Sequence, residues 1–372
     1  MTKNYYSLGL MSGTSMDGVD ASVIQTDGKS NYRAILDKYF EYPKVIYKHL
    51  TKLRDKIKRS EDLKNFSKEI KNVEKEITLF HAKAVKKILK KTAVNVDFIG
   101  FHGQTIFHNA GKKITKQLGD GKLLSKITKK NVVYDFRQND LKNKGQGAPL
   151  TPIFHKLLAK KLNLKNVTFL NIGGIINETS ILEGDYSTVT DLGPGMCLID
   201  AWIRKNSKKK YDDQGKIAMT GKINNSILKK TYNQIQEIIY LNKINKNLNK
   251  STFDIKDFDL YYFDQLSLKN GAATITELTF KTLLTSFWVS KPKFKIILCG
   301  GGRKNNFLVK KIKKYKKSYV KLIDEYGVNG DFVESQAFAY LAIRSFLKLP
   351  ISFPETTGCD NPCTGGKIVK NY

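Results

Sequence analysis

Polar and apolar positions alternate near the start of the chain, and this alternation predicts three strands. Apolar side chains recur at every second position within residues 5–11, 19–26 and 32–42. A period of two places such side chains on one face of a strand. Turns are expected at 13–18 and 27–30, where glycine and small polar residues gather. The chain therefore opens with an antiparallel sheet.

The next part of the chain changes from a period of two to helical spacing. Helices are predicted over residues 45–58 and 61–91. In the second, apolar side chains recur three or four positions apart, at Ile70, Val73, Ile77, Phe80, Ala84 and Ile88. Short apolar runs at 96–101 and 132–136 predict buried strands that end at His102 and Arg137. Prolines 149 and 152 favour a helix start near 151–162, because a first turn tolerates proline.

A strand, a glycine turn and a second strand recur about halfway along the chain. Residues 167–182 repeat the opening pattern, with Gly173 and Gly174 at the turn. Asp191 is predicted to end a further strand, just before Gly193 and Gly195. Another strand at 294–299 precedes a third glycine cluster, at 300–302. Helices are predicted over 196–206, 222–240, 272–288, 306–316 and 333–347, and a flexible connection over 242–251.

The first glycine turn has the residues that a phosphate-binding hairpin needs. Glycine lets the backbone approach a ligand closely, and successive N–H groups in such a turn form an anion-binding concavity. Thr14 and Ser15 add hydroxyl donors, and Asp17 is a candidate cation ligand. An ordinary hairpin turn has similar letters, so this segment alone leaves both interpretations open. Two such hairpins and a late glycine cluster together indicate a two-lobed ATP-dependent phosphotransferase.

At these residues the chain resembles the anhydro-N-acetylmuramic acid kinases of bacterial cell-wall recycling. The matching segments occur in family order and span nearly the whole chain: 11–20, 101–105, 135–137 with 145–149, 171–174, 191–195, 299–302 with Asn305, and 333–339. The resemblance implies the α/β fold of actin-like ATPases and sugar kinases, with two lobes, duplicated ribonuclease-H-like cores and a cleft between the lobes. We expect lobes at 1–136 and 137–372, and the C-terminal tail is free to return to the first lobe.

The resemblance also implies a reaction and its residues. Asp191 would be the general base, activating a water that attacks the anomeric carbon while the freed O6 attacks the γ-phosphate of ATP. Asp17 would lie near Mg²⁺. Substrate contacts are expected from His102, Gln104, Arg137 and Glu334. ATP contacts are expected from Gly13, Thr14, Ser15, Met16, Asp17, Gly18, Val19, Asp20, Gly173, Gly174, Gly193, Gly195, Gly300, Gly301, Gly302 and Asn305.

Each of these residues also has an ordinary structural interpretation. Asp191 could cap a helix or close a turn, Arg137 could form a surface salt bridge, and His102 could be a buried structural residue. Glu334 begins a predicted helix, where the dipole favours a carboxylate. Met196 departs from the family, which usually has asparagine there, and this departure concerns catalytic efficiency more than reaction type.

Composition narrows the class of protein. The formal net charge is +31 over 372 residues, but lysine is scattered and no nucleic-acid-binding motif accompanies it. No apolar run approaches the ~18 residues of a membrane span, and four cysteines do not indicate a disulfide framework. A metal site at Cys359 and Cys363 is disfavoured because no second pair lies nearby.

We therefore expect a cytoplasmic enzyme that uses ATP and Mg²⁺ on an anhydro-muramic sugar, with no nucleic-acid or membrane partner. The family also implies a homodimer and a role in peptidoglycan recycling. Two alternatives remain open at this stage. One is a kinase for another amino sugar on the same fold, and the other is a non-kinase, actin-like ATPase that binds a partner.

Overall fold

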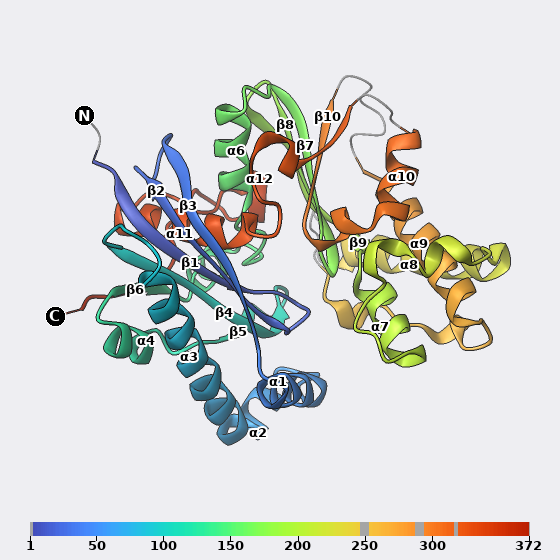
Figure 1. Cartoon of the computed structure of the whole chain (residues 1–372), viewed down its shortest axis with the longest axis horizontal. Helices are drawn as coiled ribbons and strands as arrows, with labels where there is room; N and C mark the ends of the chain where they lie inside the picture. The colour runs from blue at the N-terminus through green and yellow to red at the C-terminus, as the bar shows by residue number, and fades with distance from the viewer. Residues whose placement is uncertain (1–2, 246–252, 287–293, 316–318, 372) are drawn as a thin grey trace. The chain divides into compact units, whose positions relative to one another are not determined.

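The computed structural model describes residues 3–245, 253–286, 294–315 and 319–371 (Figure 1). The chain forms two compact units. Unit 1 comprises Met1–Lys161 and Phe332–Tyr372, and unit 2 comprises Leu162–Asp331. Each unit contains its own mixed sheet with helices packed against it. The predicted α/β architecture of two lobes with duplicated cores is confirmed.

The sheet of unit 1 has the strand order β12-β6-β4-β1-β2-β3, and β5 pairs with β4 outside this order. Strands β1, β2 and β3 are antiparallel neighbours, whereas β1, β4 and β6 run parallel. The strands are β1 (Tyr5–Ser12), β2 (Gly18–Thr26), β3 (Tyr32–Glu41), β4 (Phe98–Asn109), β5 (Ile114–Leu118), β6 (Asn131–Tyr134) and β12 (Lys367–Val369).

Helices pack on both faces of this sheet. Leu8 and Leu10 of β1 pack with apolar side chains of α1 and α3, while Met11 contacts a second core that contains Phe338 of α11. Figure 1 shows α3 and α11 on opposite sides of the strands. The helices of unit 1 are α1 (Lys44–Lys56), α2 (Asp62–Asn65), α3 (Ser67–Leu89), α4 (Gly121–Thr128), α5 (Gln138–Lys142), α6 (Pro152–Lys161), α11 (Val333–Phe346) and α12 (Pro354–Thr357).

Helix α11 lies unusually close to the sheet because two facing strand residues are glycines. A Cβ atom on Gly9 would lie 1.8 Å from the carbonyl oxygen of Ser335, and one on Gly100 would lie 2.2 Å from that of Phe338. The hydroxyls of Ser22 and Ser335 are 2.6 Å apart across the same contact. The C-terminal tail therefore belongs to unit 1.

The division between the units differs from the expected boundary after residue 136. Residues 137–161 remain with unit 1 because their side chains pack there. Asn139 Nδ2 donates to the Thr364 carbonyl at 2.6 Å, and the Phe154 ring packs edge-on against Tyr32 at 5.1 Å between centroids. The chain passes to unit 2 only after α6.

Unit 2 repeats the strand order of unit 1. Its sheet runs β11-β10-β7-β8-β9, so that an antiparallel β7-β8-β9 meander continues into β10 and β11, which run parallel to β7. This is the pattern of β3-β2-β1-β4-β6. The strands are β7 (Asn166–Ile172), β8 (Ile175–Leu182), β9 (Asp185–Pro194), β10 (Lys295–Cys299) and β11 (Val320–Leu322).

Helices cover the sheet of unit 2 through two apolar clusters, one centred on Trp202 and Phe263 and the other on Ile172 and Leu298. The α-helices are α7 (Cys197–Asn206), α8 (Asn225–Asn245), α9 (Leu268–Leu283) and α10 (Asn306–Tyr315). Short 3₁₀ helices are η1 (Asp213–Gly215), η2 (Ala218–Thr220), η3 (Ile255–Asp257), η4 (Tyr261–Phe263), η6 (Gly301–Lys304) and η7 (Ile323–Tyr326).

Several predicted boundaries are wrong. Strand β4 does not end at His102 but continues to Asn109, because its second half pairs with β5. Neither β5 nor α4 was expected. Residues 242–245 belong to α8, whereas the rest of the predicted flexible connection, up to 251, lies outside the described residues. The predicted ends of two helices at 288 and 316 also lie outside them.

Candidate functional site

The first glycine turn is a loop over residues 13–17 that joins β1 to β2. Thr14 and Ser15 are exposed, while Met16 has a left-handed backbone with φ of +56° and a buried side chain. The Ser15 hydroxyl donates to Asp17 Oδ1 at 2.6 Å. The loop therefore presents hydroxyls and one carboxylate at the surface of unit 1.

Tyr42 and His81, whose side chains are buried, hold this loop through hydrogen bonds. The Tyr42 backbone N–H donates to the Asp17 carbonyl at 2.8 Å, and its hydroxyl lies 2.9 Å from Ser12 Oγ. Ser12 is also 3.3 Å from Nε2 of His81, whose Nδ1 bonds the Ile77 carbonyl at 2.7 Å. That carbonyl must accept, so His81 Nδ1 carries the proton and Nε2 accepts from Ser12.

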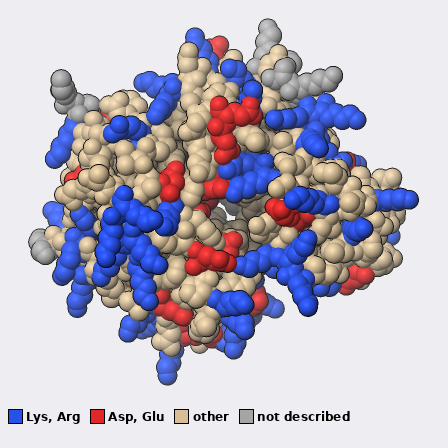
Figure 2. All heavy atoms as spheres, in the orientation of Figure 1, with Lys and Arg blue, Asp and Glu red and all other residues tan. Residues whose placement is uncertain are grey.

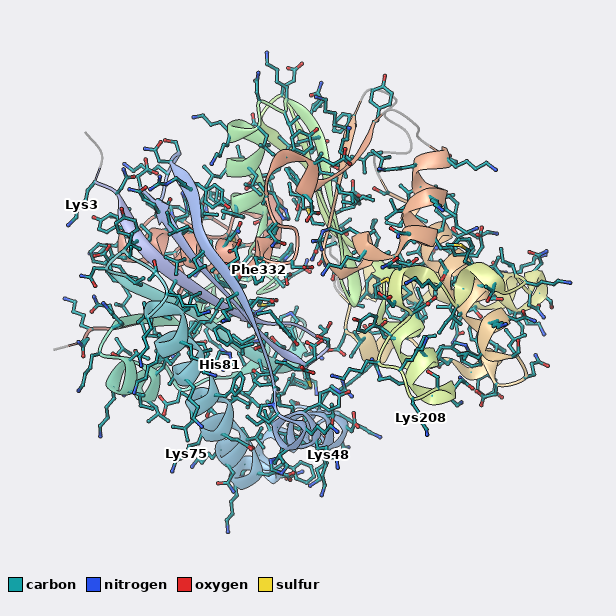
Figure 3. All side chains as sticks on the ribbon, viewed as in Figure 1. Lys3, Lys48, Lys75, His81, Lys208 and Phe332 are labelled. Atoms are coloured by element: carbon teal, nitrogen blue, oxygen red, sulfur yellow. The ribbon has the colours of Figure 1, made fainter. Side chains whose placement is uncertain are left out.

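His81 lies inside unit 1, whereas Lys48, Lys75 and Lys208 extend outward into solvent (Figure 3). Burial lowers the pKa of His81 to about 4, so the ring is neutral at physiological pH. Tyr42 and His81 were not among the residues predicted for this site. Their apolar surroundings make them look like ordinary core residues.

Three residues predicted to contact ATP lie past the turn, within β2. Val19 is completely buried in the core, and Gly18 faces β3, where a Cβ atom would lie 2.5 Å from Tyr39 and from the Phe40 carbonyl. Asp20 is half-buried and pairs with Met11 in the β1–β2 register. The side chain of Val19 therefore cannot reach a ligand in this conformation.

Gln104 and His102 lie two residues apart on β4 and bring the glycine loop and Arg137 into one region of unit 1. Gln104 Nε2 donates to the Gly13 carbonyl at 3.0 Å. Arg137 donates to His102 Nε2 from Nε at 3.2 Å and from Nη2 at 3.0 Å, and its Nη1 donates to the Gly147 carbonyl at 2.9 Å.

The histidine beside Arg137 is neutral. Burial, and then the positive charge of Arg137, lower the pKa of His102 to about 3. Its Nδ1–H donates to the Gly103 carbonyl at 2.8 Å, which leaves Nε2 as the acceptor for the guanidinium. The contacts to His102 and to the Gly147 carbonyl therefore orient the Arg137 guanidinium.

Two buried amide oxygens in this region have no hydrogen-bond partner in the described part of the chain. They are Oε1 of Gln104 and Oε1 of Gln146, and both side chains are at least 97% buried. Leaving a buried acceptor unpaired is costly, so both oxygens fit a site that a polar ligand completes. Glu334 is the second residue of α11, and Phe338 of the same helix packs on the His102 ring with centroids 4.5 Å apart.

In unit 2 the second glycine turn is bonded to the start of α7. The N–H groups of Gly195 and Met196 donate to the carbonyls of Gly174 and Gly173 at 2.9 and 2.8 Å. A Cβ atom on Gly195 would lie 2.4 Å from the Gly173 carbonyl oxygen, so only glycine permits this approach. The Met196 side chain packs against both apolar clusters of unit 2, which is a structural role in place of the family asparagine.

The prediction that Asp191 ends its strand is wrong. Asp191 lies three residues before the end of β9, at a bulge. Asn177 pairs with Asp191 and Ile176 pairs with Gly193, so Leu192 is the additional residue. A bulge re-aims the neighbouring side chains. Asn177 Nδ2 donates to Asp191 Oδ1, and the Phe253 backbone N–H donates to Oδ2 at 3.0 Å. Both carboxylate oxygens are thereby oriented.

The third glycine cluster lies between β10 and α10. Asn305 caps α10, since its Oδ1 accepts from the Leu308 N–H at 3.0 Å. Its Nδ2 is buried and has no partner among the described residues. A Cβ atom on Gly302 would lie 2.3 Å from Ile172, whereas Gly301 faces open space. The cluster thus offers an exposed backbone surface beside an unpaired donor.

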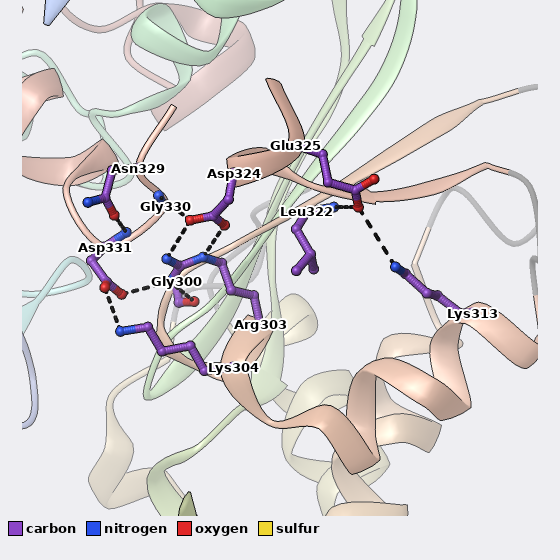
Figure 4. Close-up of polar contacts among 10 residues, drawn as sticks. All are labelled: Gly300, Arg303, Lys304, Lys313, Leu322, Asp324, Glu325, Asn329, Gly330 and Asp331. Carbon is purple, nitrogen blue, oxygen red and sulfur yellow. Dashed lines mark hydrogen bonds and ion pairs between the residues drawn. The ribbon is translucent and has the colours of Figure 1, made fainter. Parts of the chain in front are cut away.

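Arg303, which follows these glycines, is the centre of a network of ion pairs (Figure 4). No sequence motif predicted this network. The side chain is 4% exposed and donates to Asp324 at 2.6 and 2.9 Å, to Asp331 at 2.7 Å and to the Gly300 carbonyl at 3.1 Å. The bond from Arg303 lowers the pKa of Asp324. Lys304 adds a 2.5 Å contact to Asp331. The network fastens the last residue of unit 2 to the glycine cluster.

Each unit offers polar groups of its own to a ligand. In unit 2 the unpaired Asn305 donor and the open Gly301 backbone suit a nucleoside, and in unit 1 the exposed Thr14 and Ser15 hydroxyls suit phosphate. Asp17 forms no ion pair within the described parts of the chain. A single carboxylate is a common protein contribution to a Mg²⁺ site, because water and phosphate supply the other ligands.

Asp140, Cys359 and Cys363 are the other group with metal-ligand chemistry that the described residues bring together, with ligand atoms within 4.8 Å of one another. Burial raises the pKa of the Cys363 thiol to about 11 and also raises that of Cys359. Protonated thiols are poor metal ligands. Cys363 Sγ instead donates to Asp140 Oδ1 at 3.9 Å.

Lys and Arg side chains are spread over the visible surface of both units and are interspersed with Asp and Glu (Figure 2). On the face shown, the positive charge is distributed and does not form a single stripe. Among the described residues, no helix has both the length and the apolar character that a membrane crossing requires.

Comparisons with known proteins give the following matches. The family model described as anhydro-N-acetylmuramic acid kinase matches residues 5–371. A protein of that name from Pelagibacter ubique is 52% identical, and the match covers all of both chains. One from Agrobacterium fabrum is 37% identical over 98% of each chain. Among solved structures, the activator of 2-hydroxyisocaproyl-CoA dehydratase from Clostridium difficile with bound ADPNP has a TM-score of 0.42 at 10% identity, covering 91% of this chain and 94% of that one.

Proposed function

The chain belongs to the family of anhydro-N-acetylmuramic acid kinases, and from this premise we propose the reaction and its residues. The kinase opens the 1,6-anhydro ring of 1,6-anhydro-N-acetylmuramic acid with water and phosphorylates O6, with ATP as the donor. The products are N-acetylmuramic acid 6-phosphate and ADP. The observation that supports this most directly is the Asp191 carboxylate, which Asn177 and Phe253 hold at a strand bulge.

Asp191 acts as the general base. It accepts a proton from the water that attacks C1, the C1–O6 bond breaks, and O6 takes the γ-phosphoryl group. The proton then leaves Asp191 for solvent. A carboxylate suits this role when it is oriented and ionised near neutral pH. The two donors at its oxygens hold the carboxylate in one orientation.

The glycine turns bind ATP in this proposal. The loop at 13–17 holds phosphate oxygens with its backbone and with Thr14 and Ser15, and the cluster at 300–302 with Asn305 contacts adenosine. The turns at Gly173–Gly174 and Gly193–Gly195 of unit 2 are further candidates for phosphate contacts. Asp17 would hold Mg²⁺, which neutralises charge on the phosphates.

The sugar contacts come from unit 1. Arg137 binds the lactyl carboxylate that distinguishes muramic acid from glucosamine, because a planar guanidinium matches a carboxylate. His102 orients Arg137 through its neutral Nε2. Gln104 contacts a sugar hydroxyl through Oε1, which has no partner in the described structure. Glu334 is a further candidate ligand for the sugar, and the supporting observation is its place at the start of α11.

Family membership also supports the wider setting that we propose. We propose that the enzyme acts in peptidoglycan recycling, in the cytoplasm, and that it assembles as a homodimer. Size-exclusion chromatography with light scattering measures the last of these directly.

The test is an assay of ADP release with purified protein, ATP and Mg²⁺, with and without the anhydro sugar, and mass spectrometry of the product. We expect ADP release to depend on the anhydro sugar and the product to be the 6-phosphate. N-acetylglucosamine serves as the comparison sugar, since it lacks the lactyl carboxylate. Equal ADP release without sugar, or preference for N-acetylglucosamine, would contradict the proposal.

A further inference from the structure

A buried carboxylate outside the proposed active-site residues contacts the loop that holds Arg137. Asp140 lies on α5 and is 1% exposed. Its Oδ2 accepts from the Gly147 backbone N–H at 2.6 Å, and its Oδ1 accepts from the Thr357 hydroxyl at 2.5 Å. Hydrogen bonds to an ionised oxygen are stronger than neutral ones, so this carboxylate is a strong anchor for the Gly147 peptide.

The loop around Gly147 is shaped to meet Asp140 at two points. The Gly145 N–H donates to the Asp140 carbonyl at 2.9 Å, and a Cβ atom on Gly145 would lie 2.2 Å from Asp140 Oδ2. Gly147 has φ of +72°, a conformation that glycine adopts without strain. Both glycines are therefore needed for the loop to close around this one side chain.

The Gly147 residue that Asp140 holds by its N–H also holds Arg137 by its carbonyl. Arg137 Nη1 donates to the Gly147 carbonyl at 2.9 Å, while Nε and Nη2 donate to His102. His102 is fixed in turn by its bond to the Gly103 carbonyl and by the Phe338 ring. The guanidinium is thus held by His102 on β4 and by the loop that Asp140 anchors.

We propose that Asp140 is a positioning residue for sugar recognition, acting through the Gly147 peptide to set the orientation of Arg137. This inference rests on the proposed function, because it assumes that Arg137 binds the carboxylate of the substrate. Asp140 does not touch the substrate itself. Its effect is confined to the affinity for an acidic sugar and does not extend to ATP.

The alternative is that Asp140 only stabilises the fold. Thr357, which bonds the other carboxylate oxygen, separates the two roles. Thr357→Val removes the hydroxyl donor to Oδ1, keeps the longer Cys363 Sγ contact to the same oxygen, and leaves the Oδ2–Gly147 bond in place. If Asp140 acts through Gly147, Thr357→Val should lower the melting temperature and leave the sugar KM within about twofold of the wild-type value.

The experiment is a double-mutant cycle on the full chain, with KM measured for the anhydro sugar and for ATP. We expect Asp140→Asn to raise the sugar KM about tenfold, which corresponds to about 1.4 kcal/mol, and to leave the ATP KM unchanged. In an Arg137→Ala background the same substitution should change the sugar KM less than twofold, since its intermediary is already gone. If Asp140→Asn does not fold, Asp140→Glu keeps the charge, moves the carboxylate by one methylene and should raise the sugar KM in the same selective way.

Three results would overturn the inference: an equal effect of Asp140→Asn in both backgrounds, a parallel rise in the sugar and ATP KM values, or a lower melting temperature with an unchanged sugar KM. Phosphorylation of the anhydro sugar by the wild-type protein and by Thr357→Val shows whether the role of Asp140 alone is wrong or the proposed function is wrong as well. If both phosphorylate the anhydro sugar while the cycle is additive, only the role of Asp140 is wrong. If neither does, the proposed function and the inference fail together.

Discussion

Replacing Asp191 with asparagine removes the proposed base and retains the shape of the side chain. Loss of a general base typically lowers turnover ~10²–10⁴-fold, which adds about 2.7 to 5.4 kcal/mol to the activation barrier. The fold should survive. Both oxygens of Asp191 accept hydrogen bonds, from Asn177 Nδ2 and from the Phe253 N–H, so an amide NH₂ group would face a donor at one of them.

Rotation of the Asn177 amide resolves that conflict. It would present Oδ1 to the new NH₂ group, at the expense of a 3.4 Å contact from Asn171. Such a long contact is weak, so we expect a stability loss of about 1 kcal/mol, at the lower end for a perturbed buried hydrogen bond. In a domain of this size that lowers the melting temperature by about 2–4 °C.

The assay compares turnover at saturating ATP and sugar, ATP affinity by calorimetry, and melting temperature. Asp185→Asn is the matched control, because it makes the same change at an exposed position of the same strand, and it should keep normal turnover. We expect Asp191→Asn to bind ATP with wild-type affinity. Turnover within about threefold of wild type would refute the assignment of the base, and loss of ATP binding would place Asp191 in the nucleotide site instead.

Three further outcomes follow from the structure and the proposal. In H₂¹⁸O, label should appear at C1 of the product and not in its phosphate; label in the phosphate would mean that water attacks phosphorus. Arg137→Lys should raise the sugar KM about tenfold to a hundredfold, because an ammonium cannot reproduce the planar contacts, and an increase in the ATP KM alone would move Arg137 to the nucleotide site. Burial lowers the pKa of His81 and His155 to about 4 and that of His102 to about 3. Because the unfolded chain therefore binds more protons than the folded chain below pH 6.5, the free energy of unfolding should fall from pH 6.5 to pH 5. A free energy of unfolding that does not change with pH in urea titrations would contradict this, and His155→Gln should reduce its dependence on pH.

The hairpins and helices were predictable because local patterns determine them. Alternation in 5–42 and the three- and four-residue spacing in α3 each arise from one face of one element being buried. Strand β4 was predicted too short because its continuation depends on pairing with β5, a contact that no local pattern reports. The boundary after residue 136 differs from the observed division for a similar reason, since it depends on packing such as that of Phe154 against Tyr32.

The return of α11 to unit 1 depends on pairs of residues that are far apart in sequence. Gly9 and Gly100 each look like an interruption of an apolar strand, and a lone strand glycine is ambiguous. Their purpose becomes clear only beside Ser335 and Phe338, whose carbonyl oxygens occupy the space of the missing side chains. A single sequence contains both residues of such a contact, but no local pattern in it indicates that the two residues meet.

The candidate site contains two kinds of residue. Some belong to recognisable sequence motifs, and others hold those residues in place. The glycine turns, Asp191 and Arg137 belong to segments that resemble a family, so they could be named in advance. Asn177, Tyr42, His81 and Asp140 could not, because each acts by fixing another group: Asn177 the Asp191 carboxylate, Tyr42 and His81 the loop at 13–17, and Asp140 the Gly147 peptide. In a sequence, an aspartate that fixes another group cannot be told from an aspartate that caps a helix. Only its hydrogen-bond partners distinguish the two roles. Asp140 accepts a hydrogen bond from the Gly147 N–H, and the Gly147 carbonyl accepts one from Arg137, the arginine that we assign to the substrate.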